Sequence, residues 1–357
     1  MQVLLTSSKS VEYPRISQLM TNLKSLGHEV EHLHIPLSSA FGVGASLKGK
    51  LRSMEVDVVI CGFFGQHAVR ICKKYIPDAP VILDAFVSAY QTLVKDRRDK
   101  RFLLVAPLVK LYEKRMLSSS DSIITDTQFH LEYFAKMYGL PEGKLSVMPV
   151  SSSFEGHEPT ETITFEQRKF IHFHGEIQRF HGLEEILPSI KSLGNMGFTT
   201  SLYLGEKGEK WLANHSNEFN DKVQFTTETV PYSMLLNSME KSLASLGIFR
   251  KSQKADLVIP NKVVESLSLG VPCITLSTIP TRNLLKNSKF GDNNLENGLI
   301  LVEDPSEVES VIRDIAESEE IWRKSSKNAK KLYEQEFNST NNEKILYRLI
   351  EEVTRVD

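Results

Sequence analysis

Short apolar runs alternate along the chain with longer segments whose apolar residues recur every three or four positions. The runs are typical of strands buried in a parallel sheet, and the periodic segments are typical of amphipathic helices. In the first part of the chain, the runs that predict strands are Val3–Thr6, Glu29–Ile35, Asp57–Gly62, Val81–Leu83, Ser122–Thr125 and Leu145–Met148. Because the opening order is strand, helix, strand, the pattern predicts a doubly wound α/β sheet.

A polar segment divides this pattern into two parts. Residues Val150–Thr164 are rich in Ser, Glu and Thr, have no periodicity and predict a linker. The runs that predict a second sheet are Phe170–Phe173, Thr200–Leu204, Val223–Phe225, Leu243–Gly247, Val271–Thr275 and Leu299–Val302. Two charged helices are expected at the end of the chain, over about 306–336 with a break near Ser318 and over about 340–354.

Composition limits the class of protein. A length of 357 residues favours two domains, and 41% hydrophobic with 25% charged residues is ordinary for a globular chain. A formal net charge of −2 argues against general nucleic-acid binding, which needs a basic surface. The N-terminus lacks the features of a signal peptide, and no apolar run approaches the roughly 18 residues that cross a bilayer. Because there is no C-x-x-C pair, Cys61, Cys72 and Cys273 are expected to be reduced core residues of a cytoplasmic protein.

The segment KADLVIPNKVVESLSLGVPCIT, Lys254–Thr275, carries the strongest signal for a helix next to a buried strand. Pro260 suits a helix entrance because its φ angle is fixed, and Asn261 is the expected N-cap. Gly270 lies where a left-handed residue ends a helix. The segment therefore predicts a helix that enters the edge of a sheet.

Lys262 and Glu265 lie one turn apart on this predicted helix. Backbone N–H groups at a helix start attract phosphate, a lysine adds positive charge, and a carboxylate can accept from two sugar hydroxyls. The pair therefore predicts a nucleotide-type binding site. An i,i+3 salt bridge on the surface of an ordinary helix is the alternative interpretation.

The order P-N-K-x-x-E-x-L-x-x-G-x-P-x-I-T in this segment resembles the donor-site signature of the retaining glycosyltransferase family four, the group 1 type with the two-Rossmann GT-B fold. The resemblance implies that Glu265 binds the ribose of a sugar nucleotide and that Lys262 lies near its diphosphate. The preceding SLGIFRKSQKADLVIPNK is similar to one subgroup of that family. The broader family pairs two glutamates eight positions apart, and Leu257 holds the first of these positions here, with Asp256 beside it.

A second loop extends the implied donor site. HGEIQRFHG resembles the family's G-x-x-x-x-x-x-G loop under the donor diphosphate, with Gly175 and Gly182 as its glycines. Many members carry Arg and Lys where this chain has Glu176 and His181, so Arg179 is the nearest cationic substitute. The resemblance therefore implies diphosphate binding by backbone N–H groups without the family's pair of cations.

The loop after the first predicted strand, SSKSVEYPR, lacks G-x-G-x-x-G, which argues against a nicotinamide dehydrogenase. Family members often carry a Gly-Gly pair in this loop, near the diphosphate. Ser10 is expected to offer a hydroxyl there instead, and a solvated loop is the alternative. His172, His174 and His181 have no carboxylate or cysteine that would complete a zinc ligand set, so no metal is expected.

The acceptor side is predicted around Asp84, which follows a predicted strand at the place where open α/β sheets bind ligands. VILDAFVSAYQTLVKDRR also resembles the subgroup, with Gln91 in place of an aspartate; its matching polar residues are Asp84, Ser88, Asp96 and Arg97. We expect Asp84 to orient or deprotonate the incoming hydroxyl. A helix N-cap is the alternative role for this aspartate.

The run KDRRDKR, residues 95–101, holds five basic and two acidic residues and precedes the apolar run Phe102–Val109. A basic run beside an exposed apolar segment can dock on anionic lipid. The alternative is a solvated helix start followed by a core helix that Pro107 interrupts.

The resemblance implies a GT-B chain of two Rossmann-like domains facing across a cleft: an acceptor domain over 1–155, a donor domain over 156–335 and a last helix, 336–357, that crosses back to the first domain. The expected activity is metal-independent transfer of a sugar, with retention of configuration, from a nucleotide-sugar to a saccharide or lipid-linked acceptor. A non-catalytic nucleotide-sugar-binding partner subunit and a nucleotide-sugar epimerase are the alternatives. The expected location is the cytoplasm, with peripheral contact to the inner face of the membrane and no nucleic-acid partner.

Overall fold

The computed structural model describes the chain except for residues 41, 97–102, 159–162, 289, 291–292 and 356–357. The chain forms two compact units: Met1–Ser153 joined by Ser339–Asp357, and Phe154–Asn338. The division falls inside the segment that the sequence predicts as a linker.

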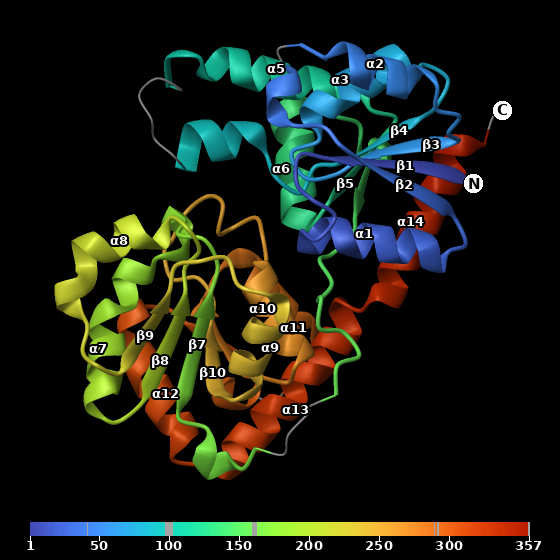
Figure 1. Ribbon diagram of the computed structural model, residues 1–357. Coiled ribbons are helices and arrows are strands. Elements are labelled where there is room, and N and C mark those ends of the chain that lie inside the picture. The colour runs from blue at the N-terminus through green and yellow to red at the C-terminus, as the bar shows by residue number, and fades with distance from the viewer. Residues whose placement is uncertain (41, 97–102, 159–162, 289, 291–292, 356–357) are drawn as a thin grey trace. The chain divides into compact units, whose positions relative to one another are not determined.

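The first unit is built on a six-stranded parallel sheet in the order β2-β1-β3-β4-β5-β6 (Figure 1). Its strands are β1 Gln2–Ser7, β2 Glu29–His34, β3 Val58–Cys61, β4 Val81–Asp84, β5 Ser122–Thr125 and β6 Leu145–Val147. The strands β3, β4 and β5 are buried along their whole length, as their continuous apolar character predicts. The chain reverses its direction of winding between β1 and β3, where open sheets of this kind bind ligands.

Helices cover the first sheet, and the last one arrives from the far end of the sequence. They are α1 Pro14–Ser25, α2 Ala45–Arg52, α3 Gln66–Tyr75, α5 Ala106–Ser119, α6 Gln128–Tyr138 and α14 Ser339–Thr354. Shorter helical turns are Leu37–Ala40, Gln91–Asp96 and Glu142–Lys144. Leu346 and Ile350 of α14 pack with Ile16 of α1 and Val3 of β1 in one apolar cluster. The C-terminal helix therefore completes the core of the first unit.

The second unit contains another six-stranded parallel sheet, in the order β12-β11-β10-β7-β8-β9. Its strands are β7 Phe170–His174, β8 Thr199–Tyr203, β9 Val223–Thr226, β10 Ser242–Leu246, β11 Cys273–Leu276 and β12 Leu299–Val302. Its helices are α7 Leu187–Asn195, α8 Gly208–His215, α9 Tyr232–Glu240, α10 Asn261–Ser268, α11 Ile279–Ser288, α12 Val308–Ala316 and α13 Glu319–Glu336. Shorter turns are Phe165–Gln167, Arg179–His181, Leu183–Ile186, Ser216–Glu218, Asn294–Glu296 and Pro305–Glu307. The strands β7 and β10 are neighbours at the reversal of this sheet, so their carboxyl ends form its ligand-binding edge.

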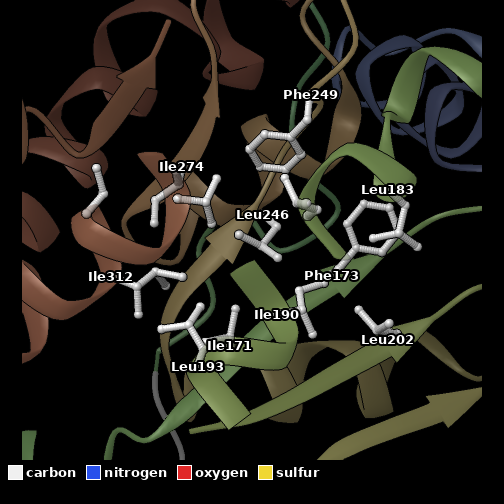
Figure 2. Close-up of a cluster of buried hydrophobic side chains, with 14 of the residues drawn as sticks. Ile171, Phe173, Leu183, Ile190, Leu193, Leu202, Leu246, Phe249, Ile274 and Ile312 are labelled. Atoms are coloured by element: carbon white, nitrogen blue, oxygen red, sulfur yellow. The ribbon is translucent and has the colours of Figure 1, made fainter. Parts of the chain in front are cut away.

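The core of the second unit fills the space between this sheet and its helices (Figure 2). Phe173 on β7, Leu246 on β10 and Ile274 on β11 meet Ile190 of α7 and Ile312 of α12 in this cluster. All five side chains are fully buried. A continuous core of this kind fixes the strand ends from which the functional loops start.

Several predicted elements differ from the structure at their ends. The helix expected from Leu183 begins as a 3-10 turn, and α7 starts at Leu187 with proline in its first turn. The strand expected from Val271 starts at Cys273, because Pro272 has no N–H for the sheet. Pro107 lies in the first turn of α5, so it starts this helix and does not interrupt one.

The break predicted near Ser318 is confirmed. Ser318 is the N-cap of α13, and its side chain accepts a hydrogen bond from the N–H of Ile321. The described helices include none that is both long enough and apolar enough to cross a membrane.

Candidate functional site

The helix α10 positions the residues that the sequence singles out. Pro260 is its N-cap, with extended dihedral angles, and its carbonyl accepts from the N–H of Val263 at 2.9 Å. The prediction of Asn261 as the N-cap is therefore wrong, because proline takes that position and Asn261 is already the first helical residue. Gly270 has a φ of 68°, which confirms the predicted left-handed end.

Lys262 and Glu265 are both buried, with 5% and 2% of their surface exposed. The interpretation as a surface salt bridge is therefore wrong. The Nζ of Lys262 has no hydrogen-bond partner among the described residues, whereas Oε2 of Glu265 lies 2.8 Å from Nε2 of His174. The helix thus carries two buried charged side chains, of which only the carboxylate has a hydrogen-bond partner among the described residues.

The loop after β7 passes next to the lysine. Gly175 has a φ of 132°, and a Cβ atom there would lie 3.1 Å from Nζ of Lys262 and 3.4 Å from Cε1 of His181. The absence of a side chain at Gly175 is what lets the loop backbone approach the lysine so closely. The structure thus brings together Lys262, Gly175 and His181.

The cationic group has little to balance its charge. Burial lowers the pKa of Lys262 to about 7, although Cys273 and Glu265 act in the opposite direction. Burial also holds the pKa of His181 well below its usual value, and the charges of Lys262 and Lys254 lower it further. An anion beside Lys262 would restore its charge, so the site favours a negatively charged ligand.

Two histidines on one face of β7 connect Glu265 of α10 to the helix α9. His174 contacts Glu265, and its Nδ1 lies 2.9 Å from Nε2 of His172. The Nδ1 of His172 lies 2.9 Å from Oγ of Ser238 on α9. From the sequence these histidines were weighed only as metal ligands. Their spacing of two on one strand places them on the same face, which was the available signal.

The other predicted donor residues have fewer contacts. Arg179 is exposed at the start of its 3-10 turn, and Ser10 is exposed in the loop after β1. Leu257, at the position of the family's first glutamate, is 9% exposed. Asp256 beside it accepts from the N–H of Ile279 at 3.4 Å. The roles of Arg179 and Ser10 stay predictions.

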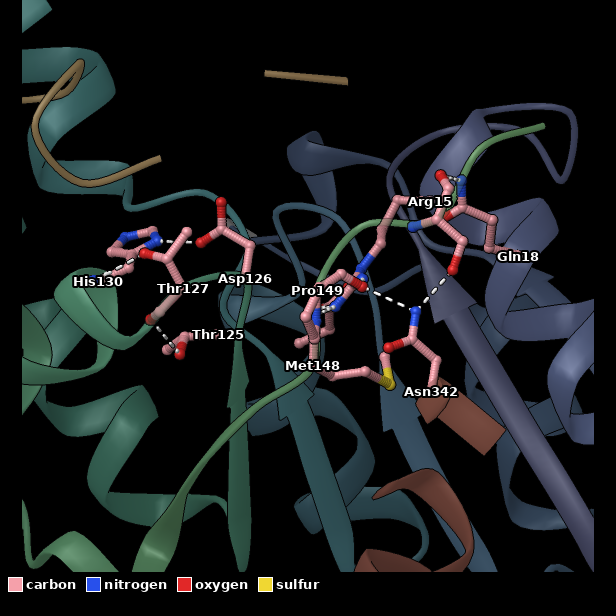
Figure 3. Close-up of polar contacts among 11 residues, drawn as sticks. Arg15, Gln18, Thr125, Asp126, Thr127, His130, Met148, Pro149 and Asn342 are labelled. Carbon is pink, nitrogen blue, oxygen red and sulfur yellow. Dashed lines mark hydrogen bonds and ion pairs between the residues drawn. The ribbon is translucent and has the colours of Figure 1, made fainter. Parts of the chain in front are cut away.

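Asp84 ends β4 and forms an ion pair with an arginine. Its two carboxylate oxygens accept from Nε and an Nη of Arg15, both at 3.0 Å. The same guanidinium donates to the carbonyls of Met148 and Pro149 (Figure 3), and both members of the ion pair are 1% exposed. Asp84 is therefore not a helix N-cap, which was the alternative. Its role toward an acceptor stays a prediction.

A buried carboxylate that the sequence did not indicate holds the segment after β4. Glu113 of α5 accepts from Oγ of Ser88 at 2.9 Å and from the N–H groups of Ala89 and Tyr90 at 2.6 and 3.0 Å. Ser88 in turn caps the π-helical turn Gln91–Asp96 by accepting from the N–H of Gln91. Arg97 and the rest of the basic run to Arg101 lie outside the described residues.

A second carboxylate follows β5. Oδ1 of Asp126 lies 2.7 Å from Nδ1 of His130, and both side chains are buried (Figure 3). Thr127 between them caps α6 by accepting from the N–H of His130. Oδ2 of Asp126 and Nε2 of His130 have no hydrogen-bond partner among the described residues. This pair places an acceptor and an imidazole nitrogen after β5, at the carboxyl edge of the first sheet.

The described residues contain no group of three or more His, Cys, Asp or Glu side chains suited to a metal ion. His172 and His174 are hydrogen-bonded to each other and do not converge on one point with free nitrogens. Metal independence stays a prediction.

Comparison with known proteins finds similarity in both sequence and fold. No family model matches the sequence. A curated relative, the chitobiosyldiphosphodolichol beta-mannosyltransferase of Candida albicans, is 26% identical over 226 residues, which cover 59% of this chain and 48% of that protein. The chain therefore spans about half the length of this relative.

Solved structures match over almost the whole chain. HepE of Anabaena in complex with UDP-glucose is 12% identical with a TM-score of 0.68, covering 99% of this chain and 100% of that one. The catalytic domain of starch synthase IV from Arabidopsis thaliana, bound to ADP and acarbose, is 10% identical with a TM-score of 0.66 and covers 99% of both chains. The two strand orders and these likenesses together show that the chain has the GT-B fold.

Proposed function

We propose that the chain transfers a sugar from a nucleotide-sugar donor to a hydroxyl acceptor. One observation carries this proposal: the buried ammonium group of Lys262 has no counter-charge bound to it and lies against the loop at Gly175. This site follows β7 at the ligand-binding edge of the second sheet, where a diphosphate would supply the missing negative charge. The names of the similar proteins, with UDP-glucose, ADP and a mannosyltransferase, support the same class of donor.

In this proposal Lys262 binds the diphosphate and Glu265 binds the ribose. Oε2 of Glu265 already accepts from His174, so Oε1 and the remaining lone pairs are the groups that a ribose hydroxyl would meet. His181, Arg179, Asn261 and Ser10 remain secondary candidates for contacts with the donor. The sum of these contacts would fix the leaving group before the bond breaks.

The chemical step follows from where charge develops. As the bond from the sugar to the diphosphate breaks, negative charge grows on the departing phosphate, and a fixed cation stabilises it more than it stabilises the ground state. In other transferases a divalent ion stabilises this charge. Here one lysine and backbone dipoles would stabilise it, so we propose metal independence. We propose retention of configuration on the strength of the sequence resemblance.

Two carboxylates are candidates for the acceptor side. Asp84 is fixed by Arg15, and a carboxylate oxygen that accepts one hydrogen bond retains a lone pair for a second. Asp126 keeps one oxygen without a partner among the described residues, with His130 beside it. We keep Asp84 as the proposed acceptor residue and treat Asp126 as its competitor.

A lipid-linked acceptor would suit the exposed leucines at the start of α5. Leu104 lies two residues before α5 and is 85% exposed, and Leu108 and Leu111 on α5 are 66% and 62% exposed. Lys114 and Arg115 are exposed on the same helix. We propose that this leucine surface, defined as Leu104, Leu108 and Leu111, docks on anionic membrane where a lipid-linked saccharide would be held.

A non-catalytic donor-binding subunit is the second candidate, because Leu257 stands where the family has its first glutamate. A thermal-shift panel of UDP, GDP and ADP, with their sugars, tests donor binding, since a ligand of the folded state raises its melting temperature. A rise with one nucleotide supports a donor site, and no rise with any of them contradicts it. NMR of the product then compares its anomeric configuration with that of the donor and tests retention.

A further inference from the structure

Four side chains form one hydrogen-bonded series across the second unit, from α9 over β7 to α10. The series runs Ser238, His172, His174, Glu265, and each of its three links is 2.8 or 2.9 Å long. Both imidazoles are buried, His172 completely and His174 to all but 8%. Because the two imidazoles are buried, their ring nitrogens depend on these neighbours for hydrogen bonds, whereas Ser238 is half-buried.

The order of the hydrogens in this series follows from Glu265. A carboxylate can only accept, so Nε2 of His174 carries a hydrogen and donates it to Oε2. A neutral imidazole has one N–H, so Nδ1 of His174 is then an acceptor, and Nε2 of His172 must donate to it. By the same rule Nδ1 of His172 accepts from the hydroxyl of Ser238. The neutral state therefore has a single consistent arrangement.

The surroundings favour this neutral arrangement. Burial lowers the pKa of His172 well below its usual value, and positive charge on His174 or Lys262 would lower it further. The other titratable groups near the two imidazoles are His181 in the loop after β7 and Tyr203 on β8, whose ring centre is 5.4 Å from that of His172. None of these groups is an anion, and the one carboxylate in the series, Glu265, contacts only Nε2 of His174.

We propose that Ser238, His172 and His174 are positioning residues that hold Glu265 in the orientation in which it distinguishes ribose from deoxyribose. His174 binds one carboxylate oxygen, so rotation of the Glu265 side chain is restrained and the other oxygen is presented in a fixed direction. His172 and Ser238 fix the tautomer of His174 and act on the nucleotide only through it. This inference rests on the proposed role of Glu265 in the donor site.

The first test needs no nucleotide. In protein labelled with nitrogen-15 at histidine, NMR at neutral pH should report Nε2–H and an unprotonated Nδ1 for both His172 and His174. Glu265→Gln should weaken this order at His174, because an amide can also donate. An Nδ1–H tautomer at either residue in the parent protein would overturn the assigned arrangement.

The second test measures discrimination between sugars. UDP, GDP and ADP are titrated by calorimetry, followed by the 2′-deoxy form of the nucleotide that binds most tightly. The parent should prefer the ribonucleotide, His174→Ala should bind it about tenfold more weakly with most of the preference lost, and Ser238→Ala should lose about two- to fivefold. His174→Gln keeps a donor and should recover part of the preference. His157→Gln, which removes an imidazole bonded to Glu240 elsewhere in the same unit, should change nothing.

The outcomes separate the two claims. A parent that prefers the ribonucleotide while His174→Ala retains the same preference would overturn the positioning role and leave the donor site intact. A parent that binds no nucleotide, or binds both sugars equally, would overturn the proposed role of Glu265 and the positioning role with it.

Discussion

The ammonium nitrogen of Lys262 lies 3.8 Å from the centre of the Phe173 ring. A contact of this kind is worth about 2 kcal/mol when it is desolvated, whereas burying an ammonium group costs several kcal/mol. The aromatic face therefore offsets only part of the burial cost. An anionic ligand that pairs with Lys262 would offset the rest of this burial cost.

The first prediction is that nucleotide binding takes up a proton. Without a ligand, Lys262 has a pKa of about 7 and is mostly neutral at pH 8.5. A bound diphosphate would raise this pKa again. Calorimetry in buffers of different ionisation enthalpy should show uptake of close to one proton at pH 8.5 and less at pH 6.5. Lys262→Met should abolish the uptake. Equal enthalpies in all buffers for the parent would contradict the assignment.

The second prediction concerns the loop at Gly175. Gly175→Ala would place a methyl group 3.1 Å from Nζ of Lys262 at a φ of 132°, so both stability and nucleotide affinity should fall. The backbone strain is worth about 1–3 kcal/mol of unfolding free energy. Gly197→Ala is the matched control, because Gly197 has a φ of 92° but nothing within 4 Å of its would-be Cβ. If both variants lose the same nucleotide affinity, the close approach of the Gly175 loop to Lys262 is not the cause of the loss.

The third prediction concerns the charge of Glu265. Glu265→Gln keeps the shape of the side chain but weakens one charge-assisted bond to ribose, which is worth about 1.5–3 kcal/mol. Nucleoside diphosphate affinity should drop by one to two orders of magnitude, while the melting temperature changes little. Unchanged affinity would remove Glu265 from the donor site.

The fourth prediction separates the two carboxylates of the first unit. Asp84→Asn leaves the buried guanidinium of Arg15 without its counter-charge, which should lower the unfolding free energy by about 3–5 kcal/mol. If Asp84 also serves the acceptor, turnover per folded molecule should fall as well. Asp126→Asn is the comparison. Loss of turnover in Asp126→Asn alone would transfer the acceptor role to Asp126 and His130.

The fifth prediction tests the leucine surface at the start of α5. Binding to vesicles of phosphatidylglycerol and phosphatidylcholine should weaken as salt rises, since exposed charges are screened. Leu104→Gln with Leu108→Gln should reduce binding by about tenfold or more, because burying a leucine is worth about 1.5–3 kcal/mol. Met234→Gln, a change at a methionine on α9 that is 47% exposed, should have no effect. Equal recovery of the parent with and without vesicles would contradict membrane docking.

Local patterns predicted most of the secondary structure and one part of the site. The strands Ser122–Thr125 and Leu299–Val302 have the predicted bounds, because a short apolar run between polar turns has few other ways to be buried. Lys262 and Glu265 share one helix, so their relation follows from a spacing of three. The cap of that helix was mispredicted because a proline precedes the asparagine.

The partners of buried charges were beyond prediction because they depend on tertiary packing. Arg15 reaches Asp84 across 69 positions in the chain, and His174 reaches Glu265 across 91. Glu113 lies in the middle of an ordinary helical pattern, and only the arrival of the segment after β4 turns it into a hydrogen-bond acceptor for that segment. No local signal marks such contacts.

The most direct test of sugar transfer is release of nucleoside diphosphate that depends on an added acceptor. The purified protein is incubated with each nucleotide-sugar, with and without a lipid-linked saccharide fraction, and the released nucleotide and the extended acceptor are quantified by mass spectrometry. We expect matched amounts of both products with one donor. Lys262→Met should lose at least tenfold in turnover, because no cation then opposes the charge of the departing diphosphate. If the unmodified protein binds the nucleotide-sugar but releases no nucleoside diphosphate with any acceptor, the proposed transferase activity is contradicted. The role of a non-catalytic donor-binding subunit would then remain.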